Sequence, residues 1–175
     1  MNAGADREFV PVGIAVLTVS DTRGLDQDSS GRVLIDRLAS AGHRLAGRAI
    51  LPDDVYRIRA QVSAWIVDPA VQVVLTTGGT GLTGRDGTPE ALAPLLDKII
   101  DGFGEVFRAL SFDEIGASTI QSRAIAGVAN GTYVFCVPGS SGACRTAWDK
   151  LIAPQLDYRT RPCNLVELMP RLLER

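Results

Sequence analysis

The sequence predicts a three-layer α/β/α domain, in which a mostly parallel sheet has helices on both faces and an antiparallel hairpin at one edge. Three observations support this. Apolar, β-branched runs alternate with segments of helical periodicity, the pattern of a parallel sheet with crossover helices. The pair Asn130-Gly131 separates two further apolar runs, as in a two-residue hairpin. The length of 175 residues suits one domain with a single sizeable core.

The first half of the chain supplies three predicted strands, at residues 12–19, 45–51 and 71–76. The second is weakened by Gly47. A helix between the first two strands should end at Gly42, a natural C-terminal stop. The next helix should be capped by Asp53 or Asp54. Its apolar positions recur at helical spacing, at Val55, Ile58, Val62, Trp65 and Ile66.

The second half begins with a helix expected from Thr88 as cap, with proline and an acid in its first turn, and shortened or kinked by Pro94. A second amphipathic helix is expected around residues 103–110, and residues 111–123 have no clear assignment. The hairpin strands are residues 124–129 and 132–137. A last helix around residues 147–152 should end near Pro154. We therefore expect a flexible N-terminal segment at 1–10, the α/β domain at 11–164 and a C-terminal tail at 165–175.

Composition excludes several classes of function. Apolar residues make up 46% of the chain, charged residues 22%, and the formal net charge is −2, so no strong field favours nucleic acid or an anionic membrane. No secretory signal or continuous apolar span is visible, and a cytoplasmic protein is the expectation. Any anionic ligand must be held locally. The three cysteines lack metal-ligand spacing, Cys136 should be a buried thiol, and the single His43 should be solvated or close a helix.

Three loops rich in glycine and hydroxyl residues leave the carboxyl ends of predicted strands, where sheets of this class bind ligands. They are Ser20-Asp21-Thr22, Thr76-Thr77-Gly78-Gly79-Thr80-Gly81 and Pro138-Gly139-Ser140-Ser141-Gly142. Glycine lets backbone N–H groups approach an oxyanion, and hydroxyl groups add donors. If the strands are parallel, all three loops open on one edge. The sequence therefore predicts a phosphate-binding site there.

Carboxylates near these loops would repel a phosphate unless a cation intervenes, which favours Mg²⁺. The candidates are Asp21, Asp53, Asp54, Asp86 and Glu90. Capping or solvation is the ordinary role of most of them. Asp86 is the strongest candidate because it lies inside the glycine loop. Of the nearby arginines, Arg145 is the best phosphate ligand, Arg85 is a second possibility, and Arg108 and Arg123 are expected to form surface salt bridges.

Two familiar motifs are excluded. Residues 79–84 fit G-x-G-x-x-G, but they follow the third strand rather than the first and no helix begins directly after them, which argues against a dinucleotide-binding oxidoreductase. Residues 79–86 have the spacing of a P-loop, but Arg85 and Asp86 replace its lysine and hydroxyl residue.

The ordered set of motifs resembles the MoaB/Mog family of molybdenum cofactor biosynthesis. It comprises Ser20-Asp21, residues 76–81, Arg85-Asp86-Gly87-Thr88-Pro89-Glu90, Gly102-Phe103-Gly104-Glu105, Pro138-Gly139-Ser140 and residues 143–148. Residues 103–123 and 159–164 are closer to the MoaB branch. The resemblance spans residues 11–164. It implies a homotrimer or homohexamer that binds molybdopterin, and active members use Mg-ATP to adenylylate it.

The resemblance also implies roles for individual residues. The pocket for the pterin and its phosphate would be lined by Ser20, Asp21, Gly78, Gly79, Thr80, Gly81, Pro138, Gly139 and Ser140, and we add Thr77, Glu90 and Arg145 from the loops around them. Asp53 and Asp86 would serve the Mg-ATP step, with Asp54 as the neighbour of Asp53. The terminal phosphate of molybdopterin would attack the α-phosphorus of ATP, so no catalytic histidine is needed. The alternative is a non-catalytic molybdopterin-binding or carrier protein.

Overall fold

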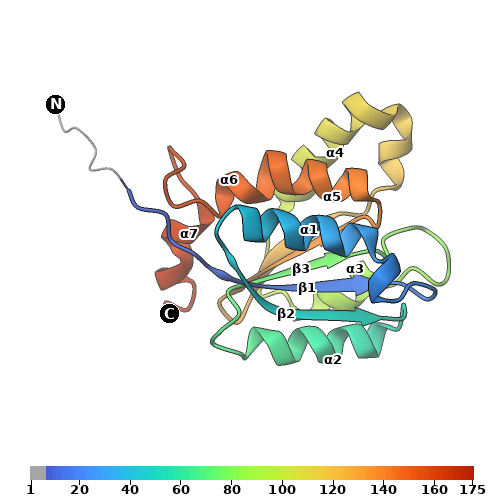
Figure 1. Cartoon of the computed structure of the whole chain (residues 1–175), viewed down its shortest axis with the longest axis horizontal. Helices are drawn as coiled ribbons and strands as arrows, with labels where there is room; N and C mark the ends of the chain where they lie inside the picture. The colour runs from blue at the N-terminus through green and yellow to red at the C-terminus, as the bar shows by residue number, and fades with distance from the viewer. Residues whose placement is uncertain (1–6) are drawn as a thin grey trace.

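The computed structural model describes residues 7–175 and contains a six-stranded sheet in the order β2-β1-β3-β6-β5-β4 (Figure 1). The strands are β1 Gly13–Val19, β2 Arg44–Leu51, β3 Val73–Thr77, β4 Lys98–Ile99, β5 Ile125–Ala129 and β6 Thr132–Val137. Strands β2, β1, β3 and β6 are parallel, while β5 is antiparallel to both β6 and β4. The predicted fold class is confirmed, and β4 is an edge strand that the sequence did not indicate.

Helices cover both faces of this sheet. They are α1 Ser29–Ser40, α2 Val55–Ile66, α3 Thr88–Leu92, α4 Asp101–Ile115, α5 Ser141–Ala147, α6 Ala153–Gln155 and α7 Leu165–Leu168. A π-helical segment, Trp148–Ile152, joins α5 to α6, so this helix continues past Pro154 to Gln155. In Figure 1, α1, α4 and α5 lie on one side of the sheet and α2 lies on the other.

The alternation of side chains along the strands explains the two faces. In β1, Ile14 and Val16 join the core beneath α1, α4 and α5, whereas Ala15 and Leu17 join the core beneath α2 and α3. All seven residues of β1 are buried, as expected for a strand covered on both sides. The second face also explains Gly47, since a Cβ at this position would lie 2.9 Å from the indole nitrogen of Trp65.

The hairpin between β5 and β6 is confirmed in detail. Asn130 and Gly131 both have positive φ, 48° and 78°, as a type I′ turn requires. Because β6 pairs in parallel with β3 on its other side, this hairpin brings the chain back to the centre of the sheet. The carboxyl end of β6 therefore lies beside that of β3.

Two predicted helix starts have different outcomes. The side chain of Asp54, rather than that of Asp53, caps α2 by accepting from the N–H groups of Tyr56 and Arg57 at 3.0 and 2.9 Å. The prediction that Thr88 caps α3 is wrong, because Gly87 is the N-cap and Thr88 is already helical. As expected from Pro94, α3 is short and passes into a 3₁₀ turn, Ala93–Leu95.

The C-terminal residues pack on the same core as the rest of the domain. Val166 of α7 is buried, and the hydroxyl of Tyr133 in β6 donates to the carbonyl of Leu165 at 2.9 Å. Of the N-terminal segment predicted to be flexible, residues 1–6 lie outside the described residues. In the remaining part, Arg7 forms an ion pair with Glu167 at 3.0 Å. No helix in the described part of the chain is long and apolar enough to cross a membrane.

His43 follows the end of α1, but it is buried rather than solvated. Its Nδ1 accepts from the N–H of Val12 at 3.2 Å, and its ring lies between those of Phe9 and Trp148. Burial lowers its pKa from 6.5, and nearby Arg44 adds to the decrease, whereas Asp157 opposes it. Among the cysteines, burial raises the pKa of Cys136 to about 12, consistent with the predicted inert thiol.

The buried His43 predicts a specific pH dependence of stability. Because its pKa is lower in the folded chain than in the unfolded chain, the free energy of unfolding is expected to be fully retained above pH 6.5 and to decrease as the pH falls below it. The slope from one group cannot exceed about 1.4 kcal/mol per pH unit. Urea unfolding between pH 5 and 8 measures it. Since His43 is the only histidine, His43→Gln should flatten the curve; an unchanged slope would contradict the assignment.

Candidate functional site

The loops that follow β1, β2, β3 and β6 meet at the carboxyl edge of the sheet, because these four strands are parallel. Backbone hydrogen bonds join their ends. The N–H of Ser20 donates to the carbonyl of Leu51 at 2.9 Å, and the N–H of Gly78 donates to that of Val137 at 3.2 Å. The three predicted loops therefore share one rim, together with residues 52–54 from the β2–α2 connection.

Glycines allow the close approach of these loops. Gly78 and Gly79 have φ of +97° and +66°, a region that side chains disfavour. A Cβ on Gly78 would overlap the carbonyl oxygen of Val19, at the end of β1, and a Cβ on Gly139 would lie 3.0 Å from the Cα of Gly78. The backbone of three loops is thus in contact around Gly78.

Three predicted hydroxyl residues hold their own loops in shape. Ser20 Oγ accepts from the N–H of Arg23 at 3.2 Å, and Ser140 Oγ caps α5 by accepting from the N–H of Ala143 at 3.0 Å. Thr77 Oγ1 donates to the carbonyl of Pro138 at 3.1 Å and so ties the second loop to the third. These three side chains therefore hold the loops of the rim in shape.

Three carboxylates from three different loops lie together at the rim. Asp21 Oδ1 accepts from the backbone N–H of Asp53 at 3.0 Å, and Asp53 Oδ1 accepts from the N–H of Gly87 at 3.0 Å. Asp86 Oδ2 accepts from both the N–H and the hydroxyl of Thr83, at 3.0 and 2.6 Å. Thr83, which the sequence analysis did not single out, therefore holds Asp86 inside the glycine loop.

The three acids differ in the direction in which the protein shifts their pKa values. Burial raises the pKa of Asp53, and the carboxylates of Asp86 and Asp21 add to the increase, against the N–H of Gly87. The hydrogen bond from Thr83 lowers the pKa of Asp86, and Arg85 lowers that of Asp21. Asp53 is thus the acid whose negative charge is least compensated by the protein.

The same region contains a buried hydroxyl without a partner. Thr88 is fully buried and its Oγ1 has no hydrogen-bond partner among the described residues. It lies beside Gly79, where a Cβ would also meet Asp53 Oδ2 at 2.5 Å. An unpaired hydroxyl next to the least compensated of the three carboxylates is the arrangement expected where a ligand or cation completes the site.

The predicted Mg²⁺ ligands, Asp53 and Asp86, fit a metal that also binds phosphate. Mg²⁺ often takes only one or two carboxylates from the protein and fills its other positions with water and substrate phosphates. Within residues 7–175, no group of three or more His, Cys, Asp and Glu side chains converges on a metal position. A cation here would therefore depend on the phosphates of its substrate.

The arginines differ from the prediction. Arg123, expected to form only a surface salt bridge, pairs with Glu90 and also donates to the carbonyls of Thr80 and Asp86. Neither spacing nor periodicity in the sequence relates it to the glycine loop, 43 residues earlier. Arg85 pairs with Asp21 at 2.7 Å on the rim.

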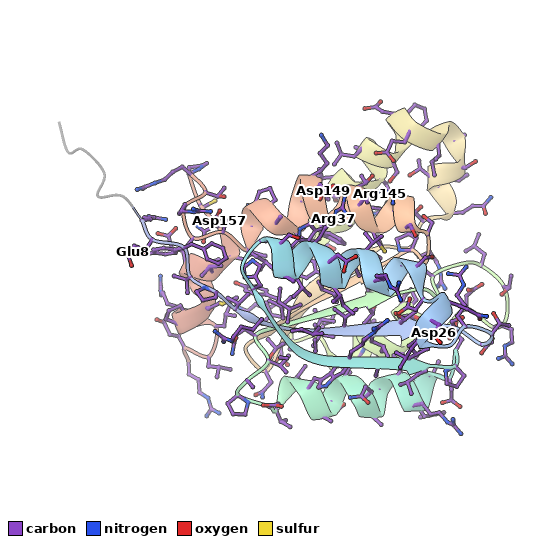
Figure 2. All side chains as sticks on the ribbon, viewed as in Figure 1. Glu8, Asp26, Arg37, Arg145, Asp149 and Asp157 are labelled. Carbon is purple, nitrogen blue, oxygen red and sulfur yellow. The ribbon has the colours of Figure 1, made fainter. Side chains whose placement is uncertain are left out.

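Arg145, the preferred phosphate ligand, is exposed on α5, and its side chain makes no hydrogen bond or ion pair with the described residues. Figure 2 shows it near Asp149 and Arg37, a pair that joins this helix to α1. The structure therefore does not bring Arg145 into contact with the other predicted site residues.

The structure supports the exclusion of a dinucleotide fingerprint. The loop containing Gly79 follows β3, and α3 begins only at Thr88 and is five residues long. A Cβ on Gly84 would have open space around it, so this glycine does not serve close packing of a helix on a strand.

Comparison with known proteins is consistent with this geometry. A model of the family described as "Probable molybdopterin binding domain" matches residues 15–158. Molybdenum cofactor biosynthesis protein B of Escherichia coli K12 is 62% identical over 157 residues, covering 90% of this chain and 92% of that protein. The protein of the same name from Bacillus subtilis is 47% identical over 147 residues, covering 83% and 86%.

A solved structure with a related sequence has a similar fold. The crystal structure of a molybdenum cofactor biosynthesis protein B superimposes with a TM-score of 0.83 at 47% sequence identity, covering 86% of this chain and 94% of that one. The family match includes all four loops that meet at the rim.

Proposed function

We propose, from the premise that this chain belongs to the molybdopterin-binding MoaB/Mog family of molybdenum cofactor biosynthesis and to its MoaB branch, that it binds molybdopterin at the carboxyl edge of the sheet and adenylylates it with Mg-ATP. The observation that carries the proposal is the meeting of three loops around Gly78 and Gly79, with the carboxylate of Asp53, the least compensated of the three acids, beside them. Glycine backbone suits the phosphate of the pterin, and the acids suit a cation bound to ATP.

In the proposed reaction, an oxygen of the terminal phosphate of molybdopterin attacks the α-phosphorus of ATP. A phosphorus–oxygen bond forms to the attacking oxygen, the bond between the α-phosphorus and the bridging oxygen breaks, and pyrophosphate leaves. The attacking oxygen is already anionic, so the protein need only hold two polyanions in line. When bound, Mg²⁺ would neutralise phosphate charge, with Asp53 and Asp86 as its protein ligands.

The loop residues have separate tasks in this proposal. Amides of residues 79–81 would hold the phosphate of the pterin, because that of Gly78 donates to Val137, while Pro138 and Gly139 form the adjoining wall. Arg85, at the rim, is paired with Asp21 and is available to exchange this partner for a phosphate. Ser20, Thr77 and Ser140 maintain the loop shapes.

A second function, binding of molybdopterin without catalysis, is favoured by one observation. Asp86 is already engaged by Thr83 at two donors, which leaves fewer of its lone pairs for a metal. Glu90, likewise, is paired with Arg123. This candidate uses the same rim and differs only in the ATP step.

A single assay with two readouts distinguishes these functions. The purified chain is incubated with molybdopterin, ATP and Mg²⁺, and pterin binding and pyrophosphate release are measured. Adenylylation predicts release of one pyrophosphate per adenylyl-molybdopterin formed and none without Mg²⁺. Binding without release would support the carrier function. Failure to bind molybdopterin would contradict both.

We further propose that the chain forms the homotrimer or homohexamer that the resemblance implies. Large apolar side chains are exposed on α4 and the turn after it: Phe112, Ile115 and Ile120 are 57%, 54% and 80% exposed. Their proximity in the sequence suits a contact between copies. Sedimentation of the purified chain tests this, and a monomer at micromolar concentration would contradict it.

A further inference from the structure

Arg123 connects three groups around the glycine loop. Its Nε donates to the carbonyl of Thr80 at 3.1 Å, its Nη2 donates to the carbonyl of Asp86 at 3.4 Å, and its Nη1 forms an ion pair with Glu90. The side chain is largely buried, with 26% exposed. One guanidinium thus reaches both ends of the loop tip, 81–85, and the helix that follows it.

The loop needs such a contact. Gly78 and Gly79 give its first part wide conformational freedom, and residues 82–85 are exposed. The remaining bonds are local or lie on the rim side, as between Thr83 and Asp86. Arg123 is fixed from behind, because Arg108 of α4 donates to the carbonyls of the two residues beside it, Ser122 and Ala124. Arg123 therefore links the exposed loop tip to α4 through Arg108.

We propose that Arg123 is a positioning residue for the glycine loop, and that Glu90 acts through Arg123 rather than as a direct ligand of molybdopterin or phosphate. By binding the carbonyls of Thr80 and Asp86, Arg123 holds the loop without using its amides and keeps Asp86 beside Asp53. The planar fork of arginine suits two carbonyls and one carboxylate together, which a lysine cannot match. The consequences for binding rest on the function proposed above.

The compensating charges of Arg123 and Glu90 support the positioning role of Arg123. The ion pair with Arg123 lowers the pKa of Glu90, so that acid is ionised and already compensated. The charge of Arg123 is in turn compensated by Glu90 and its donors are occupied, whereas Arg85 is an exposed residue on the rim that could exchange its one partner, Asp21, for a phosphate. The two arginines would therefore differ in kind: loss of Arg123 changes loop order, whereas loss of Arg85 does not.

The test compares Arg123→Gln, Arg123→Lys, Glu90→Gln and the double variant Arg123→Gln/Glu90→Gln with the wild-type chain. Arg37→Gln is the matched control, because Arg37 also makes two charge-assisted hydrogen bonds, to Asp149, but away from the loop (Figure 2). Hydrogen exchange of residues 80–88 measures loop order, molybdopterin titration measures affinity, and thermal unfolding monitors the fold. Exchange requires no ligand, so it tests Arg123 even if the proposed function fails.

For Arg123→Gln we expect exchange of the loop amides to increase at least about tenfold and the dissociation constant for molybdopterin to increase roughly 10- to 100-fold, as for the loss of charge-assisted hydrogen bonds. The melting temperature should remain near that of Arg37→Gln. Arg123→Lys should recover only part of the loss. Glu90→Gln should add little to Arg123→Gln, because the two act as one unit.

Two results would overturn the proposal. One is loop exchange in Arg123→Gln equal to that in Arg37→Gln. The other is additive losses of molybdopterin affinity in the double variant, which would make Glu90 a ligand in its own right. If Arg123→Gln does not fold, Arg123→Lys decides: wild-type loop exchange in that variant would show that the fork to two carbonyls is unnecessary. Absence of molybdopterin binding by the wild-type chain would refute the proposed function and leave the exchange result valid.

Discussion

Replacing Asp53 with asparagine is expected to abolish adenylyl transfer and to leave the fold at least as stable as that of the wild-type chain. Asparagine can still accept the hydrogen bond from the N–H of Gly87 through its carbonyl oxygen, so the loop contact is retained. It cannot supply the charged oxygen beside Gly79 that would bind a cation. The loss of turnover should be at least about 100-fold, as for other preorganised electrostatic groups.

The expected stability follows from the sign of the pKa shift. The pKa of Asp53 is higher in the folded chain than in the unfolded chain, so its ionisation costs stability, and this cost appears as the pH rises through its unfolded value. At neutral pH the ionised Asp53 therefore destabilises the fold, and a neutral asparagine removes the repulsion from Asp86 and Asp21. A residue retained against stability is typical of a functional site.

Asp54→Ala is the control for Asp53→Asn. Asp54 is the neighbouring acid and caps α2, so its replacement should cost about 1 kcal/mol of stability and leave turnover near the wild-type level. Pyrophosphate release and urea unfolding of both variants give the comparison. If Asp53→Asn retains turnover, or if Asp54→Ala loses it, the assignment of Asp53 to the Mg-ATP step is wrong.

The fold could be predicted because its signals are local. β1 is buried along its whole length and mainly apolar since it is covered on both faces, and Asn130-Gly131 adopts the two positive φ values that its hairpin demands. The loops could be placed on one edge because parallel strands leave no other arrangement. The two-residue strand β4 has no such signal, since its hydrogen bonds to β5 come from the tertiary fold.

The parts of the site that the sequence did not reveal depend on contacts between distant residues. Arg123 reaches Thr80 from a turn after α4, and His43 is buried by Phe9 and Trp148 from opposite ends of the chain. Neither contact produces a periodic pattern in the sequence. The error over Thr88 has another cause: threonine, proline and glutamate suit a helix start, but the N-cap is Gly87, one residue earlier, and the hydroxyl of Thr88 is buried without capping the helix.

Among glycine-to-alanine substitutions at the rim, Gly78→Ala is expected to lower the free energy of unfolding most. Its φ of +97° costs a side chain about 1–2 kcal/mol, and the new Cβ would overlap the carbonyl oxygen of Val19 in the backbone of β1, which cannot rotate away. Together we expect a loss of at least about 3 kcal/mol. The clash would also push the loop from its neighbours, so molybdopterin binding should be lost even where the variant folds.

Gly84→Ala is the matched control, because it adds the same methyl group to the same loop. Gly84 has open space around it and its φ lies outside the left-handed region, so alanine there should be neutral or raise stability by about 0.4–1 kcal/mol through the unfolded chain. The urea concentrations at which the two variants are half unfolded measure this difference in stability. Equal midpoints would mean that the loop after β3 does not touch β1, and without that contact the loops would not share a rim on which to hold a phosphorylated pterin.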